Sequence, residues 1–236
     1  MNRNIILATC LTMLLSSCIL DTNYDAADFT GKVLPRITGY TTGVTNDWIY
    51  FNMTTDSIYN KTAPNQEITE GQQLTRTDWD FAFCGHHVRT NGGTSGPGKG
   101  AAADLGYGDY KKWTSAAQIP KDTKWVIDND TSVNVTISQN EWYSYLAKQG
   151  LDADQYPWFD PNSGPQQKRS SANPLLEQSI AVSGPPMSYA PSYHTYVIRS
   201  ADGKHYYKLQ IVSWYNTKTE IGGDGGQISY YLDKLK

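Results

Sequence analysis

The amino-acid sequence predicts a mainly β fold, a single antiparallel sheet or sandwich-like domain with projecting loops and one short helix. Apolar and polar residues alternate with a period of two in 79–84 and 133–137, which is the pattern of half-buried strands. Asp202-Gly203 separates two runs rich in β-branched and aromatic residues, which is typical of a hairpin with a type I′ turn. One segment carries clear start and stop signals of a helix.

The strands can be placed in chain order. Residues 48–51 are a compact aromatic and β-branched run, and 79–84 alternate so that one face should be buried and the other solvated. Residues 195–200 and 204–215 flank the Asp-Gly turn as the two strands of a hairpin. A last strand is expected at 228–232, where apolar and aromatic residues return after a glycine-rich loop.

The one expected helix covers about 139–148. Ser138 and Glu141 have the spacing of a capping box at its start, and Gly150 stands where a glycine commonly ends a helix. The apolar face is formed at i, i+3 and i+4 by Trp142, Tyr145 and Leu146.

The N-terminus has the features of a secretory signal. A short apolar run at 5–15 follows Arg3, and it is too short to span a bilayer. Leu15-Ser16-Ser17-Cys18 resembles a bacterial lipobox, so we expect residues 1–17 to be a lipoprotein signal peptide that is cut before a lipidated Cys18. The alternative is an ordinary secretory signal cut elsewhere.

The rest of the chain is expected to form a tether and one domain. Residues 18–32 are polar and aperiodic, as in a tether, and 33–236 would be the single β domain. The formal net charge of −3 argues against a nucleic-acid partner, which requires a basic surface. Cys84 would be the only thiol left in the domain, and we expect it to be a small buried residue.

A glycine-rich stretch matches part of a nucleotide-binding loop. Gly93, Gly98 and Lys99 fit the first three fixed points of G-x-x-x-x-G-K-[ST], but Gly100 lacks the hydroxyl that binds Mg²⁺. The residues that follow are a poor helix candidate, although a phosphate loop requires a helix behind it. We therefore expect a connection between two strands.

The sequence indicates no catalytic residue and no enzyme. It has no H-E-x-x-H, no C-x-x-C and no G-x-S-x-G, and Asp160 begins a calcium-like loop that lacks its later acidic ligands. His86 and His87 are adjacent, and adjacent residues of a strand point to opposite faces, so we do not expect them to bind one ion together.

The segment 151–192 is rich in proline and carries several aromatic residues. Long aperiodic loops in compact domains often have a function, so these rings could form an exposed binding platform. The alternative is that they pack against the end of a sheet. The aromatic residues concerned are Tyr156, Trp158, Phe159 and Tyr189.

Two blocks carry a resemblance to a known family. WDFAF with the later VRTNGGTSGPGKGAA, within 78–103, and YVIRSADGK with YKLQI, within 195–215, resemble the HmuY family of bacterial haem-binding surface lipoproteins. The resemblance covers roughly 45–235, and this chain would be a divergent member. It implies an all-β fold in which haem lies between two projecting loops and is passed on to an outer-membrane receptor.

The resemblance also implies where haem would bind. Iron would be held by two axial side chains, and Met187 is the best candidate because it is a soft donor in the second loop. The first loop falls near 139–165, which contains no His or Met. The remaining candidates for contact with haem are Tyr143, Tyr145, Tyr156, Trp158, Tyr189 and His194.

These observations leave two hypotheses. The first is a lipid-anchored protein of the bacterial outer-membrane surface that binds haem, taken free or from haem-carrying proteins, and delivers it to an uptake receptor. The second is a surface lipoprotein of the same fold that binds a glycan or another ligand through its loop aromatics instead of haem.

Overall fold

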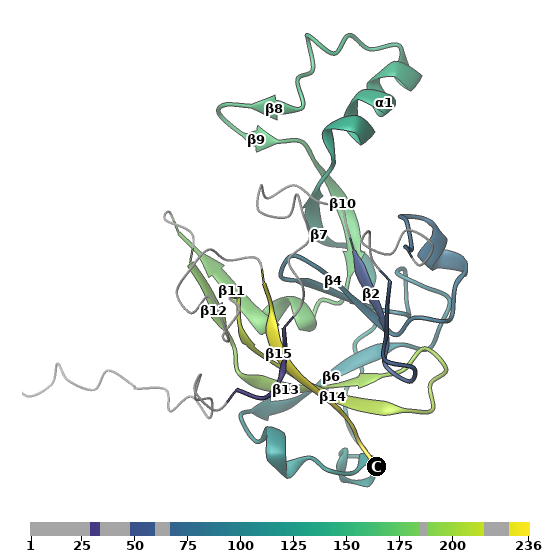
Figure 1. Ribbon diagram of the computed structural model, residues 1–236, viewed down its shortest axis with the longest axis vertical. Coiled ribbons are helices and arrows are strands. Elements are labelled where there is room, and N and C mark those ends of the chain that lie inside the picture. The colour runs from purple at the N-terminus through teal and green to yellow at the C-terminus, as the bar shows by residue number, and fades with distance from the viewer. Residues whose placement is uncertain (1–28, 34–47, 60–66, 185–187, 215–226) are drawn as a thin grey trace, which may run out of the picture.

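The computed structural model describes residues 29–33, 48–59, 67–184, 188–214 and 227–236. Its strands form antiparallel sheets, as predicted (Figure 1). The larger sheet has the order β1-β15-β14-β13-β6 and the smaller sheet the order β3-β2-β4-β5. The larger sheet consists of β1 (Lys32–Val33), β6 (Ala101–Tyr107), β13 (His194–Arg199), β14 (Tyr206–Ser213) and β15 (Ser229–Lys234). The smaller consists of β2 (Ile49–Asn52), β3 (Ser57–Tyr59), β4 (Phe81–Cys84) and β5 (His87–Thr90).

Three two-stranded ribbons and a few short helices complete the fold. The first ribbon pairs β7 (Asn129–Thr136) with β10 (Gln167–Ala172), and the second pairs β11 (Ile180–Ser183) with β12 (Ser188–Pro191). The third pairs β8 (Phe159–Asp160) with β9 (Gly164–Pro165). The helices are α1 (Gln139–Gln149) and the 3-10 turns η4 (Gln72–Thr75), η5 (Tyr110–Lys112), η6 (Ala116–Gln118) and η7 (Leu176–Ser179).

The main core lies between the larger sheet and the smaller sheet. Phe51, Phe81 and Phe83 of the smaller sheet are buried in one cluster with Leu209 and Tyr230 of the larger sheet. Phe51 stacks on Phe81 with 4.8 Å between ring centroids. The two sheets therefore form a sandwich, which confirms the predicted fold class.

The expectation that β4 has one solvated face is wrong. All four of its residues are buried, because Phe81 and Phe83 point into the main core while Ala82 and Cys84 enter a second cluster. Trp79 precedes the strand and also lies in the second cluster. The β7–β10 ribbon covers this face of the sheet with Val133 and Val135 and the Ala172 methyl group. Cys84 is buried there, as expected.

The β7–β10 ribbon continues into an arm formed by residues 137–166, which lies beyond the ribbon at one end of the molecule (Figure 1). The predicted helix is present in it as α1. The Ser138 side chain accepts a hydrogen bond from the Glu141 amide at 3.2 Å, and Gly150 ends the helix in the left-handed conformation. The Glu141 carboxylate is directed to Lys168 on β10, at 2.6 Å.

The predicted hairpin is present, but its turn differs. β13 ends at Arg199 and β14 begins at Tyr206, and only Gly203 of the Asp-Gly pair has a positive φ, of 75°. The type I′ prediction is therefore wrong. The Asp202 carboxylate instead accepts hydrogen bonds from the Ser200 hydroxyl and the Lys204 amide, which stabilises a longer connection.

The glycine-rich stretch connects β5 to β6, as expected. β6 is a strand, so no helix follows Lys99 and the nucleotide-loop alternative is excluded. Asn91 organises the loop by donating to the carbonyls of Arg76 and Trp79 and accepting from the Gly98 amide. A Cβ atom at Gly92 would lie 2.0 Å from the Gly100 carbonyl oxygen, so the close approach of the two chain segments requires glycine there.

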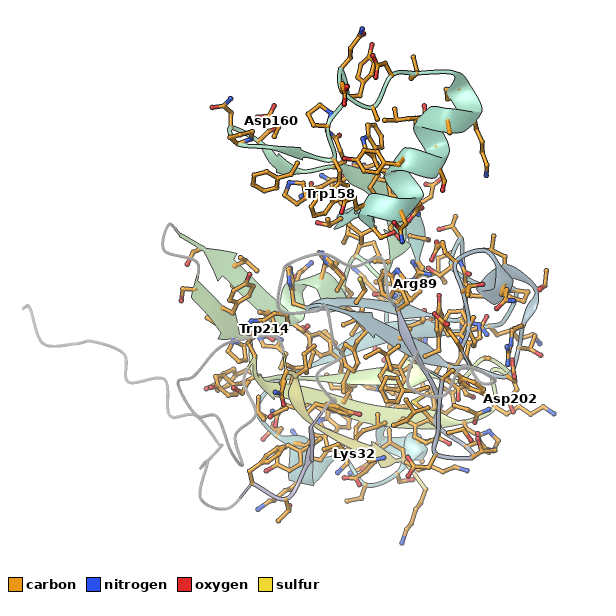
Figure 2. All side chains as sticks on the ribbon, turned by 45° about the horizontal axis from the view of Figure 1, so that its top comes forward. Lys32, Arg89, Trp158, Asp160, Asp202 and Trp214 are labelled. Atoms are coloured by element: carbon orange, nitrogen blue, oxygen red, sulfur yellow. The ribbon has the colours of Figure 1, made fainter. Side chains whose placement is uncertain are left out.

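Arg89 joins the smaller sheet to the ribbon that supports the arm (Figure 2). Its side chain is fully buried. The guanidinium donates to the Ser170 hydroxyl at 2.8 Å, the Ser171 carbonyl at 3.2 Å and the Tyr50 hydroxyl at 3.0 Å. It also lies 3.6 Å from the centroid of the Trp48 ring. A buried charge is stable only when it is bonded in this way.

We expect Arg89→Ala to lower the free energy of unfolding by about 3–5 kcal/mol, because it removes these bonds and leaves the Tyr50 and Ser170 hydroxyls without the donor. Urea denaturation measures the change. The matched control is Arg169→Ala on the exposed face of the same ribbon, where we expect a change within about 0.5 kcal/mol. Equal losses for the two variants would contradict the role given to Arg89.

A second buried polar group lies at the base of the arm. The Asp128 carboxylate accepts hydrogen bonds from the Thr90 amide at 2.8 Å, the Thr90 hydroxyl at 2.6 Å and the Asn173 amide group at 2.9 Å. Burial raises the pKa of the Asp128 carboxyl from 3.8 to about 6. Because the folded-state pKa lies above the unfolded value, this group stabilises the fold most below about pH 4, and that contribution is lost as the pH rises through 6.

We therefore expect the wild-type protein to gain stability relative to Asp128→Asn as the pH falls from about 7 to about 4, by up to about 3 kcal/mol. The asparagine variant should also be less stable at every pH, because its NH₂ group would face donor groups of Thr90 or Asn173 that the carboxylate accepts from. Urea denaturation at a series of pH values measures both effects. Parallel pH profiles for the two proteins would contradict the raised pKa.

Candidate functional site

The predicted aromatic residues of the arm are partly used to hold the arm together. The Trp158 indole donates to the Ile137 carbonyl and the Trp142 indole donates to the Tyr156 carbonyl, both at 2.8 Å. Trp142 also stacks on Tyr145 with 5.5 Å between centroids. The two indole groups therefore hold the arm together.

Other rings of the arm remain open to solvent. The exposed fraction is 50% for Tyr145 and 52% for Phe159, and Tyr143 and Tyr156 are exposed as well. These four side chains lie on α1 or on the chain that leads from it into β8. An exposed aromatic surface on the arm is consistent with both sequence-based hypotheses.

Tyr189 belongs to a different group. It lies on β12 and stacks on Trp214 with 4.7 Å between centroids and 18° between the ring planes. The His86 ring lies 5.7 Å from both of these rings. The β11–β12 hairpin thus contributes one partly buried ring to an aromatic cluster beside the β4–β5 turn.

His194 is placed apart from both groups. It begins β13 opposite Tyr107 of β6, and its Nδ1 atom lies 2.8 Å from an Asp104 carboxylate oxygen. Met187 and Cys18, the predicted iron ligand and lipidation site, lie outside the described residues, as do the signal peptide and most of the tether. The predicted site residues that are described therefore fall into three groups on different elements.

The expectation that His86 and His87 lie on one strand and point to opposite faces is wrong. β4 ends at Cys84 and β5 begins at His87, and Cys84 pairs with His87, so Gly85 and His86 form a two-residue turn. Gly85 has a φ of 63°, which fits the first position of a type II′ turn. Because His86 is in the turn and not on a strand, the two imidazole rings lie together, with 4.2 Å between centroids.

Glu177 of η7 completes this cluster. One of its carboxylate oxygens lies 2.7 Å from the Nδ1 atom of His87, and the other accepts a hydrogen bond from the Val88 amide at 3.0 Å. The cluster was missed because Glu177 is distant in sequence, although the glycine before the two histidines was a signal that a turn occurs there. Its three residues, His86, His87 and Glu177, are called the histidine cluster below.

Burial affects the protonation of one member of the histidine cluster, His86. Burial, with a smaller contribution from His87, lowers the pKa of the His86 imidazole to about 4. His86 is therefore neutral at physiological pH, and a neutral imidazole has one protonated ring nitrogen and one with a free lone pair. Within the described part of the chain its ring lies against those of His87, Tyr189 and Trp214, and it makes no hydrogen bond.

The arm and the β11–β12 hairpin both project from the sandwich. Figure 1 shows the β8–β9 end of the arm and the β11–β12 hairpin extending on the same side of the molecule. Figure 2 shows Trp158 in the arm and Trp214 beside the hairpin on that same side. The two projecting elements are far apart in sequence.

A shallow hollow of about 200 Å³ lies over the glycine-rich loop. Lys99 and Arg199 are the two charged residues that line it. The Arg199 guanidinium donates to the Lys99 carbonyl at 2.7 Å. This hollow is on the β5–β6 connection and is separate from the aromatic groups.

Comparison with known proteins identifies the lineage of the fold. The sequence model described as HmuY protein matches residues 44–231. A structure of apo PinO from Porphyromonas gingivitis is 15% identical, with a TM-score of 0.53 over 88% of this chain and 99% of that one. A Tannerella forsythia apo HmuY analog is 14% identical, with a TM-score of 0.51 over 87% and 95%.

A third structure comes from Bacteroides vulgatus and is described as a HmuY_like heme binding protein. It is 19% identical, with a TM-score of 0.50 over 80% of this chain and 86% of that chain. A search of curated proteins finds no match. Over the parts of the chain that are described, no helix has the length and hydrophobicity to cross a membrane. The family match spans most of the sequence, and the chain therefore belongs to the HmuY family.

Proposed function

We propose that this protein binds haem at the bacterial cell surface and delivers it to an outer-membrane receptor. Membership of the HmuY family supports the choice of ligand, as does a structural neighbour described as heme-binding. The observation that carries the proposal is the projection of the aromatic arm and the β11–β12 hairpin on the same side of the sandwich (Figure 1). A flat apolar ligand suits a site between two such elements.

The proposed contacts combine one axial donor with several rings. Met187, which directly precedes β12, would supply a thioether to the iron. A tyrosine of the arm would be the second donor, and Tyr143, Tyr145 and Tyr156 are all exposed there. Trp158 and Tyr189 would cover the porphyrin faces. His194 is held by Asp104, so its proposed contact is with the edge of the ligand.

The location follows from the N-terminus. A lipid on Cys18 would anchor the protein to the outer membrane, and the residues between Cys18 and Phe29 would be the tether, because Phe29 is buried and Lys32 already pairs with β15 in the larger sheet. No partner in this proposal is a nucleic acid, in keeping with the negative formal charge.

The competing function is glycan binding by the arm. The exposed rings of Tyr145, Tyr156 and Phe159 favour it, because flat aromatic surfaces also bind the apolar faces of sugars. Haem would then have no part in the function, and the β11–β12 hairpin would not contribute to binding.

Titration with hemin tests the first proposal. We expect a saturable shift of the Soret band for the wild-type protein, and a loss of affinity of about tenfold or more in Met187→Ala, because an axial bond is removed. Val182→Ala is the matched control, since it truncates an exposed apolar side chain of the same hairpin that has no donor atom. The absence of any saturable spectral change in both redox states would refute haem binding.

Glycan-array binding by haem-free protein tests the competing function. We expect Phe159→Ala to abolish any such binding, because it removes an exposed ring on which a sugar could stack. The variant should still fold, because the arm is held together by hydrogen bonds of other residues, such as the Trp158 indole. Val182→Ala should retain it. Glycan binding that survives Phe159→Ala, or none at all for the wild type, would count against this function.

A further inference from the structure

The histidine cluster has the composition of a metal site. His86 and His87 come from the β4–β5 turn and Glu177 from η7, so two separate elements supply the three side chains. One ligand atom from each lies within 4.8 Å of the others. Ligand atoms around a tetrahedral ion with bonds of about 2.0–2.1 Å are about 3.3 Å apart, so small side-chain rotations would close the site.

The positions of these side chains are fixed by their surroundings. The Glu177 carboxylate is oriented by the Val88 amide and by His87. The His86 ring is packed against Trp214 and Tyr189. Asn173 connects the two elements. Its backbone amide donates to the Val88 carbonyl at 2.9 Å, and its side-chain oxygen accepts from the Leu176 amide at the start of η7. On binding, the His87–Glu177 hydrogen bond would be replaced by bonds from both side chains to the ion, while the Val88 amide would still orient the carboxylate.

The donor atoms remain reachable from solvent. The side chains of His87 and Glu177 are 19% and 18% exposed, so they lie in a partly buried position that still has access to water. The ring nitrogens of His86 are not engaged in hydrogen bonds with the described residues. A neutral imidazole with an unused lone pair is the form that binds a metal ion.

We propose that His86, His87 and Glu177 bind a divalent late first-row transition-metal ion of the Zn²⁺ class. Two imidazole nitrogens and one carboxylate oxygen form a set that Zn²⁺ accepts, and such a set leaves a fourth position for water or another ligand. Ca²⁺ and Mg²⁺ prefer oxygen donors, so this site selects against them. The site needs neither Met187 nor the arm, and it does not depend on haem binding.

Competition with a chromophoric zinc chelator tests the proposal, using purified protein that has been stripped of metal and contains no haem. We expect one saturable Zn²⁺ site that Ca²⁺ and Mg²⁺ do not fill. His86→Ala and His87→Ala should each weaken it at least tenfold. Glu177→Gln should do the same while its amide oxygen still accepts the Val88 hydrogen bond. His205→Ala is the matched control, because this histidine lies in the turn after β13, paired with Asp202.

Imidazole NMR signals provide a measurement that does not depend on the variants folding. On addition of Zn²⁺ to the wild-type protein, we expect the ring signals of His86 and His87 to shift and those of His194 and His205 to stay unchanged. The proposal is overturned if the wild type binds no Zn²⁺, if Ca²⁺ competes equally, if only His194 or His205 responds, or if folded Glu177→Gln and His86→Ala retain wild-type affinity.

Discussion

The fully buried guanidinium of Arg89 is the interaction on which the arrangement of this molecule depends. It lies where the smaller sheet meets the β7–β10 ribbon, and its partners are mostly neutral groups and a tryptophan ring, with Glu70 at 3.5 Å as the acidic one. An ion that is buried with so little opposing charge tolerates little displacement of its hydrogen-bond partners. These bonds fix the position of the ribbon on the sheet, and they thereby fix the base of the arm.

The same interaction positions the histidine cluster. Arg89 holds Ser170 and Ser171 of β10, and the chain then passes through Asn173 into η7, which carries Glu177. Asn173 is bonded to Asp128 at the start of the ribbon and to the Val88 carbonyl on β5. Asn173 therefore links the base of the arm to η7, the element that carries Glu177.

The sequence was informative where structure is local and uninformative where it depends on distant partners. The helix was predicted almost to the residue because its cap and its C-terminal glycine are within the segment itself. The turn type at Asp202 is a local exception: the prediction was wrong because the Asp202 side chain bonds to Ser200 and Lys204, two residues away on either side, instead of leaving the backbone in a tight turn. The histidine cluster required a contact across 90 residues, between His87 and Glu177, which periodicity cannot reveal.

The aromatic residues of the arm divide into two kinds, and this division bears on what the arm can bind. The indole groups of Trp142 and Trp158 are bonded to backbone carbonyls, so their ring positions are determined by the folding of the arm. Tyr145 and Phe159 expose half of their surface instead. A rigid frame that presents open rings loses little conformational entropy on binding a flat ligand. The arm provides rings and phenol groups but no histidine, so its chemistry suits contact with a flat ligand through ring faces and hydroxyl groups.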